Sequence, residues 1–207
     1  MLDKIKSFFK MLGSLFSSRQ VAPPQQPVKE IPKSSEPIQP PTAPPHSSGV
    51  TPQTTYEDLP WIQIAHAEIG VAEVPGPGSN PRIVEYSKAA DGIAEPDDVP
   101  WCSSFMNWVW KKVGLKGTGS KYARSWLKWG VGLDQFYPGC IVVFWRGDRN
   151  GELGHVTFGM KQSPAGTLCL GGNQSDQVKY SWEDTSRILA FRWPKEYPLP
   201  EGAKVIP

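Results

Sequence analysis

The chain has few cysteines, no long apolar run and no large excess of one charge, and each absence excludes a class of protein. Three of its 207 residues are Cys, and their scattered positions match neither a disulfide framework nor a zinc-ligand pattern. No apolar run reaches the roughly 18 residues of a membrane span. With a net charge of +2, a nucleic-acid partner is not expected.

The three cysteines differ in their predicted surroundings. Cys140 and Cys169 lie in predicted strands and are interpreted as buried structural residues, and the sequence leaves open whether they pair. Cys102 lies at the start of a predicted helix. If Pro100 takes the first helical position, Cys102 takes the third, where free backbone N–H groups and the helix dipole favour a thiolate.

Proline divides the chain. Half of the 22 prolines lie between Pro23 and Pro60, and residues 20–56 show no hydrophobic periodicity, so this segment is predicted to be a flexible linker. Residues 57–197 hold all the cysteines and tryptophans and are predicted to form a folded domain. Residues 198–207 are predicted to be a C-terminal tail.

Residues 1–19 are predicted to form a basic amphipathic helix. Large apolar residues recur from Leu2 to Phe16 at helical spacing, opposite a polar face. Two interpretations remain open: the helix docks on protein, or it lies on an anionic membrane surface, which we favour. Lys6 and Lys10 interrupt the apolar run and no small-residue cleavage site follows, so no cleavable signal peptide is predicted.

Helical periodicity comes first in the predicted domain and strand periodicity follows. This order is typical of the α+β class, with an antiparallel sheet. The acidic stretch from Asp91 to Asp98 lacks the ligand spacing of a calcium loop and is interpreted as solvated. Helices are predicted to begin near residues 60, 81, 100 and 120, and strands are predicted over 141–145, 155–161, 167–170 and 188–193.

The second and third predicted strands are separated by a short turn and can pair as a hairpin. The register that places Phe158 opposite Leu170 puts the large apolar side chains on one face. The same register places His155 directly opposite Asn173, about 5 Å apart at Cβ. An amide oxygen there could orient the imidazole and leave its other nitrogen facing a thiol.

These residues also have structural interpretations. His155 could be a hydrogen-bonded sheet histidine, and Asn173 a turn residue after two glycines. Gln174 and Asp176 are alternative orienting residues. Three residues are predicted to contact substrate: Trp101, Trp145 and Gln174.

As a set, five motifs resemble the CHAP and NlpC-type cell-wall hydrolases, and within them a branch common in phages and bacteria. The resemblance covers about residues 58–194 and leaves out the N-terminal helix and linker. The motifs are Pro100-Trp101-Cys102-Ser103-Ser104-Phe105, Ala123-Arg124-Ser125-Trp126-Leu127-Lys128-Trp129-Gly130, Gly139-Cys140-Ile141-Val142-Val143-Phe144, Gly154-His155-Val156 and Gly171-Gly172-Asn173-Gln174.

The resemblance implies a papain-like fold in which Cys102 is the nucleophile, His155 the base and Asn173 the residue that orients it. It implies peptidoglycan as the partner and substrate, cut within its peptide or at the sugar–peptide amide, with no cofactor and no metal. A phage endolysin or exported lytic factor is then expected, made in the cytoplasm and acting in the periplasm or at the wall. No oligomerisation signal is present, so a monomer is expected.

Two other classes of function stay open. The domain could be an inactive wall-binding module or a virion structural component that keeps the fold. It could also be a thiol hydrolase or transferase that acts on protein or on a small amide. The complete set of Cys102, His155 and Asn173 argues against the inactive alternative.

Overall fold

The computed structural model describes residues 55–206 of the chain. The predicted amphipathic helix over residues 1–19 and nearly all of the predicted linker over 20–56 lie outside the described residues. In the part that is described, no helix is both long and apolar enough to cross a membrane.

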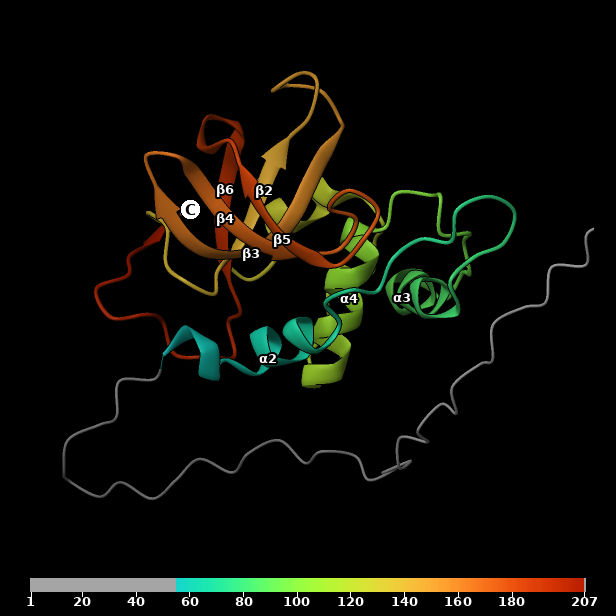
Figure 1. Ribbon diagram of the computed structural model, residues 1–207. Helices are drawn as coiled ribbons and strands as arrows, with labels where there is room; N and C mark the ends of the chain where they lie inside the picture. The colour runs from blue at the N-terminus through green and yellow to red at the C-terminus, as the bar shows by residue number, and fades with distance from the viewer. Residues whose placement is uncertain (1–54, 207) are drawn as a thin grey trace, which may run out of the picture. The chain divides into compact units, whose positions relative to one another are not determined.

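The α-helices precede the strands along the described chain (Figure 1), which confirms the α+β prediction. The helical elements are η1 (Tyr56–Asp58), α2 (Pro60–Ala67), α3 (Pro81–Asp91), α4 (Cys102–Val113), η2 (Ala123–Lys128) and η3 (Thr185–Arg187). The strands are β1 (Val131–Leu133), β2 (Ile141–Trp145), β3 (Gly154–Ser163), β4 (Gly166–Gly171), β5 (Lys179–Glu183), β6 (Ile188–Trp193) and β7 (Val205–Ile206).

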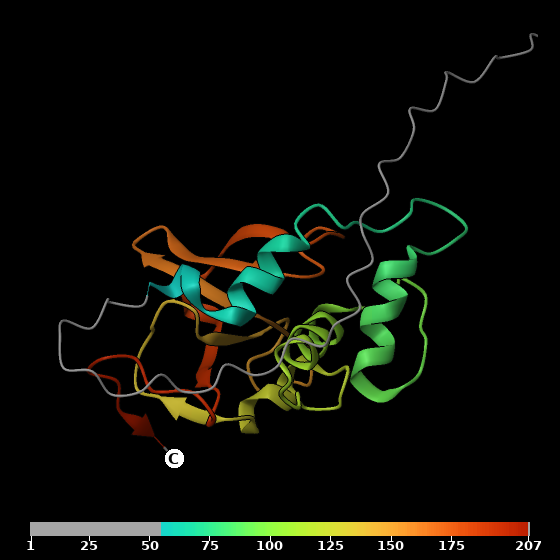
Figure 2. The same cartoon turned by 90° about the horizontal axis from the view of Figure 1, so that it is seen from below.

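All seven strands form one antiparallel sheet in the order β5-β4-β3-β2-β6-β1-β7. Helix α4 lies between this sheet and α3 in two perpendicular views (Figures 1 and 2). Strand β7 belongs to the stretch predicted as a tail, and it pairs with β1 at the edge of the sheet.

The helix ends follow local signals in the sequence. The side-chain oxygen of Asn80 caps α3 by accepting a hydrogen bond from the backbone N–H of Arg82 at 2.9 Å. Gly92 and Gly114 end α3 and α4 in the left-handed conformation that glycine adopts without strain. Pro60 is the first residue of α2, where its missing N–H costs nothing. The predicted starts of α2 and α3 and the predicted end of α4 are thereby confirmed.

The start of α4 differs from the prediction. Trp101 is the N-cap and Cys102 is the first helical residue, so Cys102 lies two positions nearer the N-terminus of the helix than predicted. Pro100 lies outside the helix. The shift leaves Cys102 in the first turn, where backbone N–H groups have no partner within the helix.

The α-helix predicted from residue 120 is wrong, because only the short 3-10 helix η2 forms there. Side chains of this segment are bonded to other segments instead. The indole N–H of Trp126 donates to Ser103 Oγ at 2.8 Å, and that of Trp129 donates to the Lys116 carbonyl at 3.0 Å. These tertiary bonds override the local helical pattern.

Helix α4 forms the centre of the hydrophobic core. Every residue from Cys102 to Trp110 is buried. Trp61 of α2 packs on Trp110 with ring centroids 5.0 Å apart, and its indole N–H donates to the Gly139 carbonyl at 2.8 Å. Because close-packed interiors allow little displacement, this packing fixes the position of the first residue of α4.

A partly buried ion pair joins the end of α2 to α3. The carboxylate of Glu68 accepts hydrogen bonds from Arg82 Nε at 2.8 Å and Nη2 at 2.7 Å, and the Tyr86 hydroxyl donates to it as well. The Tyr86 ring packs on Trp101 with ring centroids 5.8 Å apart. The network therefore reaches the residue that precedes Cys102.

The β3–β4 hairpin keeps only part of the predicted register. Phe158 faces Leu170 as predicted, but a β-bulge shifts the pairing by one residue on the side of the turn. In the other direction, β4 ends at Gly171, and Asn173 has a φ of 56° that turns the chain away from β3. The predicted pairing of His155 with Asn173 does not form.

Cys140 and Cys169 are both buried and both free. The Gly159 N–H donates to the Cys140 carbonyl at 2.8 Å, and Gly159 is paired with Cys169 on its other side. Two strand spacings, about 9.6 Å, therefore separate the two cysteines, whereas a disulfide needs Cα atoms within about 7 Å. The two thiols do not pair.

Candidate active site

Cys102 is buried at the N-terminus of α4, with 5% of its surface exposed. Burial raises the pKa of its thiol above the ordinary value. The backbone N–H of Val156, the positive charge of Arg146 and the N–H groups of Ser103 and Cys102 itself oppose this effect. The thiol is therefore protonated at neutral pH, and it needs a base to become a nucleophile.

His155 is the second residue of β3 and lies opposite Phe144 of β2. It is 1% exposed, and burial followed by the charge of Arg146 lowers its pKa to about 3. The imidazole is therefore neutral at neutral pH, which is the form that can accept a proton.

The backbone of β3 connects these two residues. The backbone N–H of Val156, the next residue after His155, lies close enough to the Cys102 thiol to lower its pKa. The N–H and carbonyl of Gly159 both bond toward Gly139–Cys140, and the alternation along an antiparallel strand directs the Val156 N–H to the opposite side. Strand β4 has already ended there, so this N–H is available to face the start of α4.

Gln174, rather than Asn173, is the amide that acts on His155. The side chain of Gln174 raises the pKa of His155 and partly offsets the effect of burial. Asn173 is half-buried, and its side chain makes no hydrogen bond to any described residue. The predicted orienting role of Asn173 therefore has no support in the geometry, whereas the alternative residue Gln174 has.

The amide of Gln174 is held in one orientation. Its Nε2 donates to the carbonyls of Lys179 and Cys169, the latter at 3.4 Å. Its Oε1 is buried and unpaired, and both ring nitrogens of His155 are buried and unpaired as well among residues 55–206. The Gln174 amide and the His155 imidazole are thus neighbours that do not form a hydrogen bond within the usual distance in this conformation. Catalytic hydrogen bonds are often long before a substrate binds.

Gly172 allows the Gln174 turn to approach α4. A Cβ atom at Gly172 would lie 2.5 Å from the Trp101 ring and 2.7 Å from Phe105 Cβ, so only glycine fits there. The following turn contains positive φ angles at Asn173, Ser175 and Asp176. This turn brings Gln174 to His155 while Gly172 packs against Trp101 and Phe105.

The two tryptophans predicted to line a substrate groove do not lie as expected. Trp101 is 1% exposed, and its indole N–H donates to Glu73 at 2.8 Å, so it is a buried support for the start of α4. Trp145 is half-buried and follows Phe144 in β2. Because neighbouring side chains alternate between the two faces of a strand, Trp145 lies on the face opposite that of His155.

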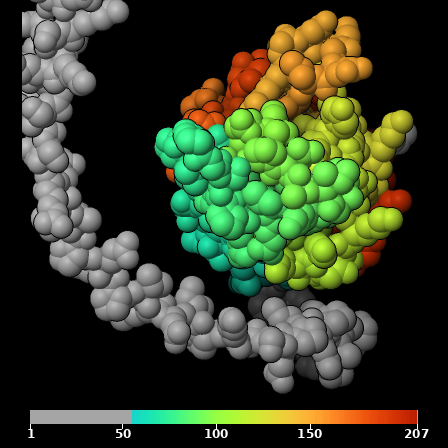
Figure 3. Space-filling model, turned by 90° about the vertical axis from the view of Figure 1, so that its right-hand side faces the viewer, coloured from blue at the N-terminus to red at the C-terminus, as the bar shows by residue number. Residues whose placement is uncertain are grey.

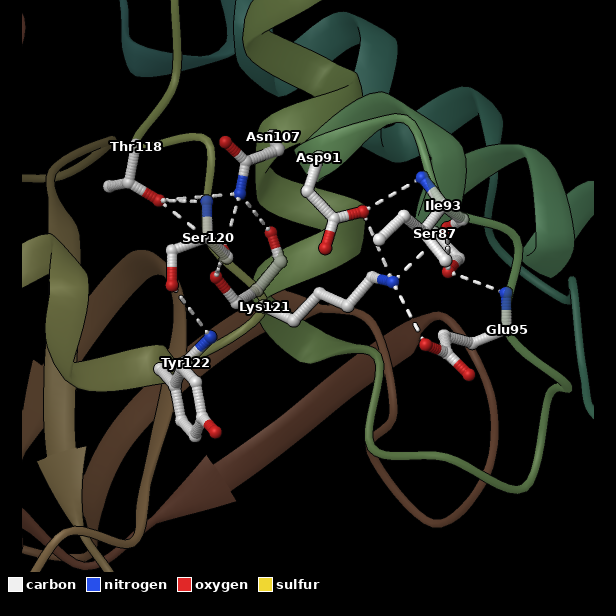
Figure 4. Close-up of polar contacts among 10 residues, drawn as sticks. Ser87, Asp91, Ile93, Glu95, Asn107, Thr118, Ser120, Lys121 and Tyr122 are labelled. Atoms are coloured by element: carbon white, nitrogen blue, oxygen red, sulfur yellow. Dashed lines mark hydrogen bonds and ion pairs between the residues drawn. The ribbon is translucent and has the colours of Figure 1, made fainter.

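A hydrogen-bond network on the Cys102 side of the candidate site involves the loop after α4 (Figure 4). Ser103 Oγ donates to the Ser120 carbonyl at 2.7 Å. Asn107 donates to the same carbonyl at 3.0 Å and accepts from the Gly119 N–H at 2.9 Å. Lys121 pairs with Asp91 at 3.1 Å. The bonds of Ser103 and Asn107 fix α4 to the loop that follows it, and the Lys121–Asp91 pair joins that loop to the end of α3.

Part of the predicted solvated loop from Asp91 to Asp98 is structural. Asp97 is 2% exposed and accepts hydrogen bonds from the backbone N–H groups of Val74 and Asn80, both at 2.8 Å. These bonds lower the pKa of Asp97. The interpretation of this residue as solvated is therefore wrong, because it joins the loop after α3 to the loop before α3. Figure 3 shows the face that these loops and α3 cover.

On the base side, Arg124 holds the connection between β2 and β3. Its three nitrogen atoms donate to the carbonyls of Leu153 at 2.9 Å, Arg149 at 3.0 Å and Asp148 at 3.0 Å. Leu153 is two residues before His155. Arg124 therefore positions the strand end that presents the imidazole.

Arg146 is the functional candidate that the sequence reasoning missed. Its backbone N–H donates to the Leu153 carbonyl at 3.2 Å, which continues the β2–β3 ladder beyond Trp145. Its charge lowers the pKa of both Cys102 and His155. The signal was present in the sequence, because pairing Phe144 with His155 places Arg146, two residues later, on the same face.

Of two cavities on the described surface, the one with the larger volume is far from these residues. It has about 620 Å³ and lies between the β3–β4 turn and Trp182–Thr185, at the opposite end of β3 from His155. The smaller has about 420 Å³ and is lined by Glu73, Asp97, Asp98 and Asp176 among others. Because Glu73 bonds Trp101, this acidic cleft adjoins the start of α4.

Comparison of the chain with protein-family models, with curated proteins and with solved structures finds no match. Across residues 55–206, no group of three or more His, Cys, Asp or Glu side chains is arranged to hold a metal ion. Any functional conclusion therefore rests on the chain's own residues and motifs.

Proposed function

We propose that this protein is a papain-like cysteine hydrolase that cleaves an amide bond of peptidoglycan through Cys102 and His155. One observation carries the proposal. A buried thiol at a helix N-terminus faces the N–H of Val156, and the adjacent His155 is a neutral imidazole with both ring nitrogens unpaired. Such a pair can perform acyl transfer without a cofactor.

The proposed reaction begins with a neutral thiol and a neutral imidazole. As Cys102 Sγ attacks the carbonyl carbon, its proton passes to His155, and the carbonyl oxygen becomes an oxyanion. The free N–H groups of Cys102 and Ser103 in the first turn of α4 are the candidate donors to that oxyanion. His155 then protonates the leaving amine as the C–N bond breaks, which leaves a thioester on Cys102.

Water completes the cycle. His155 takes a proton from the water that attacks the thioester carbonyl, and it returns the proton to the sulfur as the carboxylic acid product leaves. Gln174 supports these steps as a positioning residue, because closing its hydrogen bond to the imidazole would hold the ring and stabilise its protonated form.

The fold and substrate parts of the proposal rest on different supports. A helix with the cysteine at its N-terminus, packed on an antiparallel sheet that carries the histidine, supports the papain-like fold. Peptidoglycan is proposed because the five motifs of residues 58–194, as a set, resemble cell-wall hydrolases.

A second candidate is an inactive wall-binding or virion structural module with the same fold. The observation in its favour is burial: Cys102 and His155 are 5% and 1% exposed, so a substrate carbonyl reaches them only after local movement. An inactive module would bind peptidoglycan without releasing fragments.

Digestion of purified peptidoglycan separates the two candidates. We expect the wild type to release soluble fragments, Cys102→Ala to release none, and Cys140→Ala, which changes another buried thiol, to keep the activity of the wild type. Mass spectrometry of the fragments identifies the bond. Binding without fragments from the wild type would favour the inactive module, and fragments from Cys102→Ala would identify a different nucleophile.

A further inference from the structure

Arg146 lies on the same face of the β2–β3 hairpin as His155. Phe144 is directly opposite His155, and Arg146 follows Phe144 by two residues while the ladder continues to Leu153. Side chains two residues apart on a strand share a face, and diagonal neighbours across two strands lie about 7–8 Å apart. The guanidinium of Arg146 is therefore within side-chain reach of the imidazole.

No described residue neutralises Arg146. It is exposed, and within residues 55–206 its side chain forms no ion pair and no hydrogen bond. By contrast, Arg82 and Arg187 are paired with carboxylates, and Arg124 donates to three carbonyls. Arg146 thus presents five free N–H donors at the edge of the candidate site.

The charge of Arg146 opposes one step of the proposed reaction. His155 must accept a proton, and a nearby uncompensated cation disfavours the imidazolium. A carboxylate bound to Arg146 would remove this penalty and would also be held by two parallel hydrogen bonds. The free protein would then be poorly suited to protonate His155 until a substrate with that group is bound.

We propose that Arg146 binds a carboxylate of the substrate, so that the protein selects peptides with a free carboxylate one or two residues from the scissile amide. This inference rests on the proposed function of Cys102 and His155. It deepens that function by assigning a specificity residue and a chemical class of substrate.

The test uses two synthetic stem peptides that contain the bond cut by the wild type and differ only in one group. The carboxyl group beside the scissile amide is free in one peptide and a carboxamide in the other. Each peptide is digested by the full-length wild type, Arg146→Gln, Arg146→Lys and the matched control Arg149→Gln. Arg149 is an exposed arginine of the same connection whose side chain has no described partner.

We expect Arg146→Gln to lower kcat/KM for the carboxylate peptide by about 10- to 100-fold, the usual effect of losing a bidentate charged contact. The same change removes the charge that opposes protonation of His155, so kcat/KM for the carboxamide peptide should stay the same or rise, and should not fall. Arg146→Lys keeps the charge without the planar fork and should give an intermediate loss on the carboxylate peptide only. Arg149→Gln should match the wild type on both peptides.

The failures of the two proposals are distinguishable. If the wild type cleaves both peptides equally, or if Arg146→Gln loses the same factor on both, the carboxylate site is wrong and the hydrolase stands. If the wild type cleaves neither peptide nor intact peptidoglycan, both proposals are overturned. Thermal unfolding of each variant verifies that a loss of activity is not a loss of fold.

Discussion

The segment around Cys102 and the segment around His155 differ in how their polar atoms are paired. At the start of α4, Ser103, Asn107 and Trp126 are all joined through hydrogen bonds to the Ser120 loop. At the start of β3, both nitrogens of His155 are buried without a partner among residues 55–206. The indole nitrogens of Trp110 and Trp145 are also buried and unpaired there, but only the imidazole can accept and return a proton near neutral pH, so it is the unpaired group that points to chemistry.

The same comparison applies to the cations near the site. Arg124 is fully engaged in holding the β2–β3 connection, whereas Arg146 in that connection has no described partner. Arg149 also has no described partner, so what distinguishes Arg146 is its place two residues after Phe144, on the face of the hairpin that carries His155.

The largest expected effect on kcat comes from changing His155, whose ring nitrogens have no partner among residues 55–206. His155→Gln removes the proposed base, and we expect kcat to fall by about 10³-fold, within the range typical for general bases. The change keeps a polar side chain of similar length, so circular dichroism should match the wild type. An activity within about 3-fold of the wild type would show that His155 is not the base.

The same variant changes the acid sensitivity of the fold. The ordinary pKa of His155 is 6.5, and burial lowers it to about 3 in the folded protein. Between these values the unfolded chain binds a proton and the folded chain does not, so wild-type stability falls as the pH decreases. Relative to His155→Gln, the loss should be about 1.4 kcal/mol per pH unit. Urea unfolding of both proteins from pH 7 to pH 4 measures it.

A smaller effect is expected from the two neighbouring amides. Gln174→Ala removes the group that acts on the imidazole, and we expect kcat to fall by about 10- to 100-fold with KM little changed. Asn173→Ala is the matched control and should stay within about 3-fold of the wild type. The reverse order of the two effects would restore Asn173 as the orienting residue.

The smallest effect on kcat is expected from a change in the hydrogen-bonded network at the start of α4. Ser103→Ala leaves the indole N–H of Trp126 without its buried acceptor, and we expect the free energy of unfolding to fall by about 2–3 kcal/mol. Ser186→Ala, at the exposed η3, should change it by less than about 0.5 kcal/mol. Chemical denaturation measures both, and kcat of Ser103→Ala at a temperature where it is folded should stay near that of the wild type.

Local signals made a large part of the fold predictable. The cap at Asn80, the glycine stop at Gly114 and the apolar strand Ile141–Trp145 each depend on a few neighbouring residues. Strands β1 and β7 are too short to show a period, and β5 is half-exposed along its length. Their positions depend on pairing with distant strands, which local patterns do not encode.

The candidate site shows the same division. Cys102 and His155 were predictable from a helix start and a strand pattern. The exchange of Asn173 for Gln174 was not, because it follows from the end of β4 at Gly171 and from the turn after Gly172, which packs on Trp101. Arg146 could have been found by extending the hairpin arithmetic from Phe144 toward the loop.

The burial of Cys140 and Cys169 has a practical consequence. Both thiols have no exposed surface and lie on either side of Gly159, near the middle of the sheet. A thiol reagent can reach them only when β3 separates from its neighbours. The rate at which the reagent labels the two thiols therefore depends on how often the sheet opens. When closing is faster than labelling, that rate reports the free energy of opening. The two native thiols thus report on opening of the sheet without an engineered cysteine.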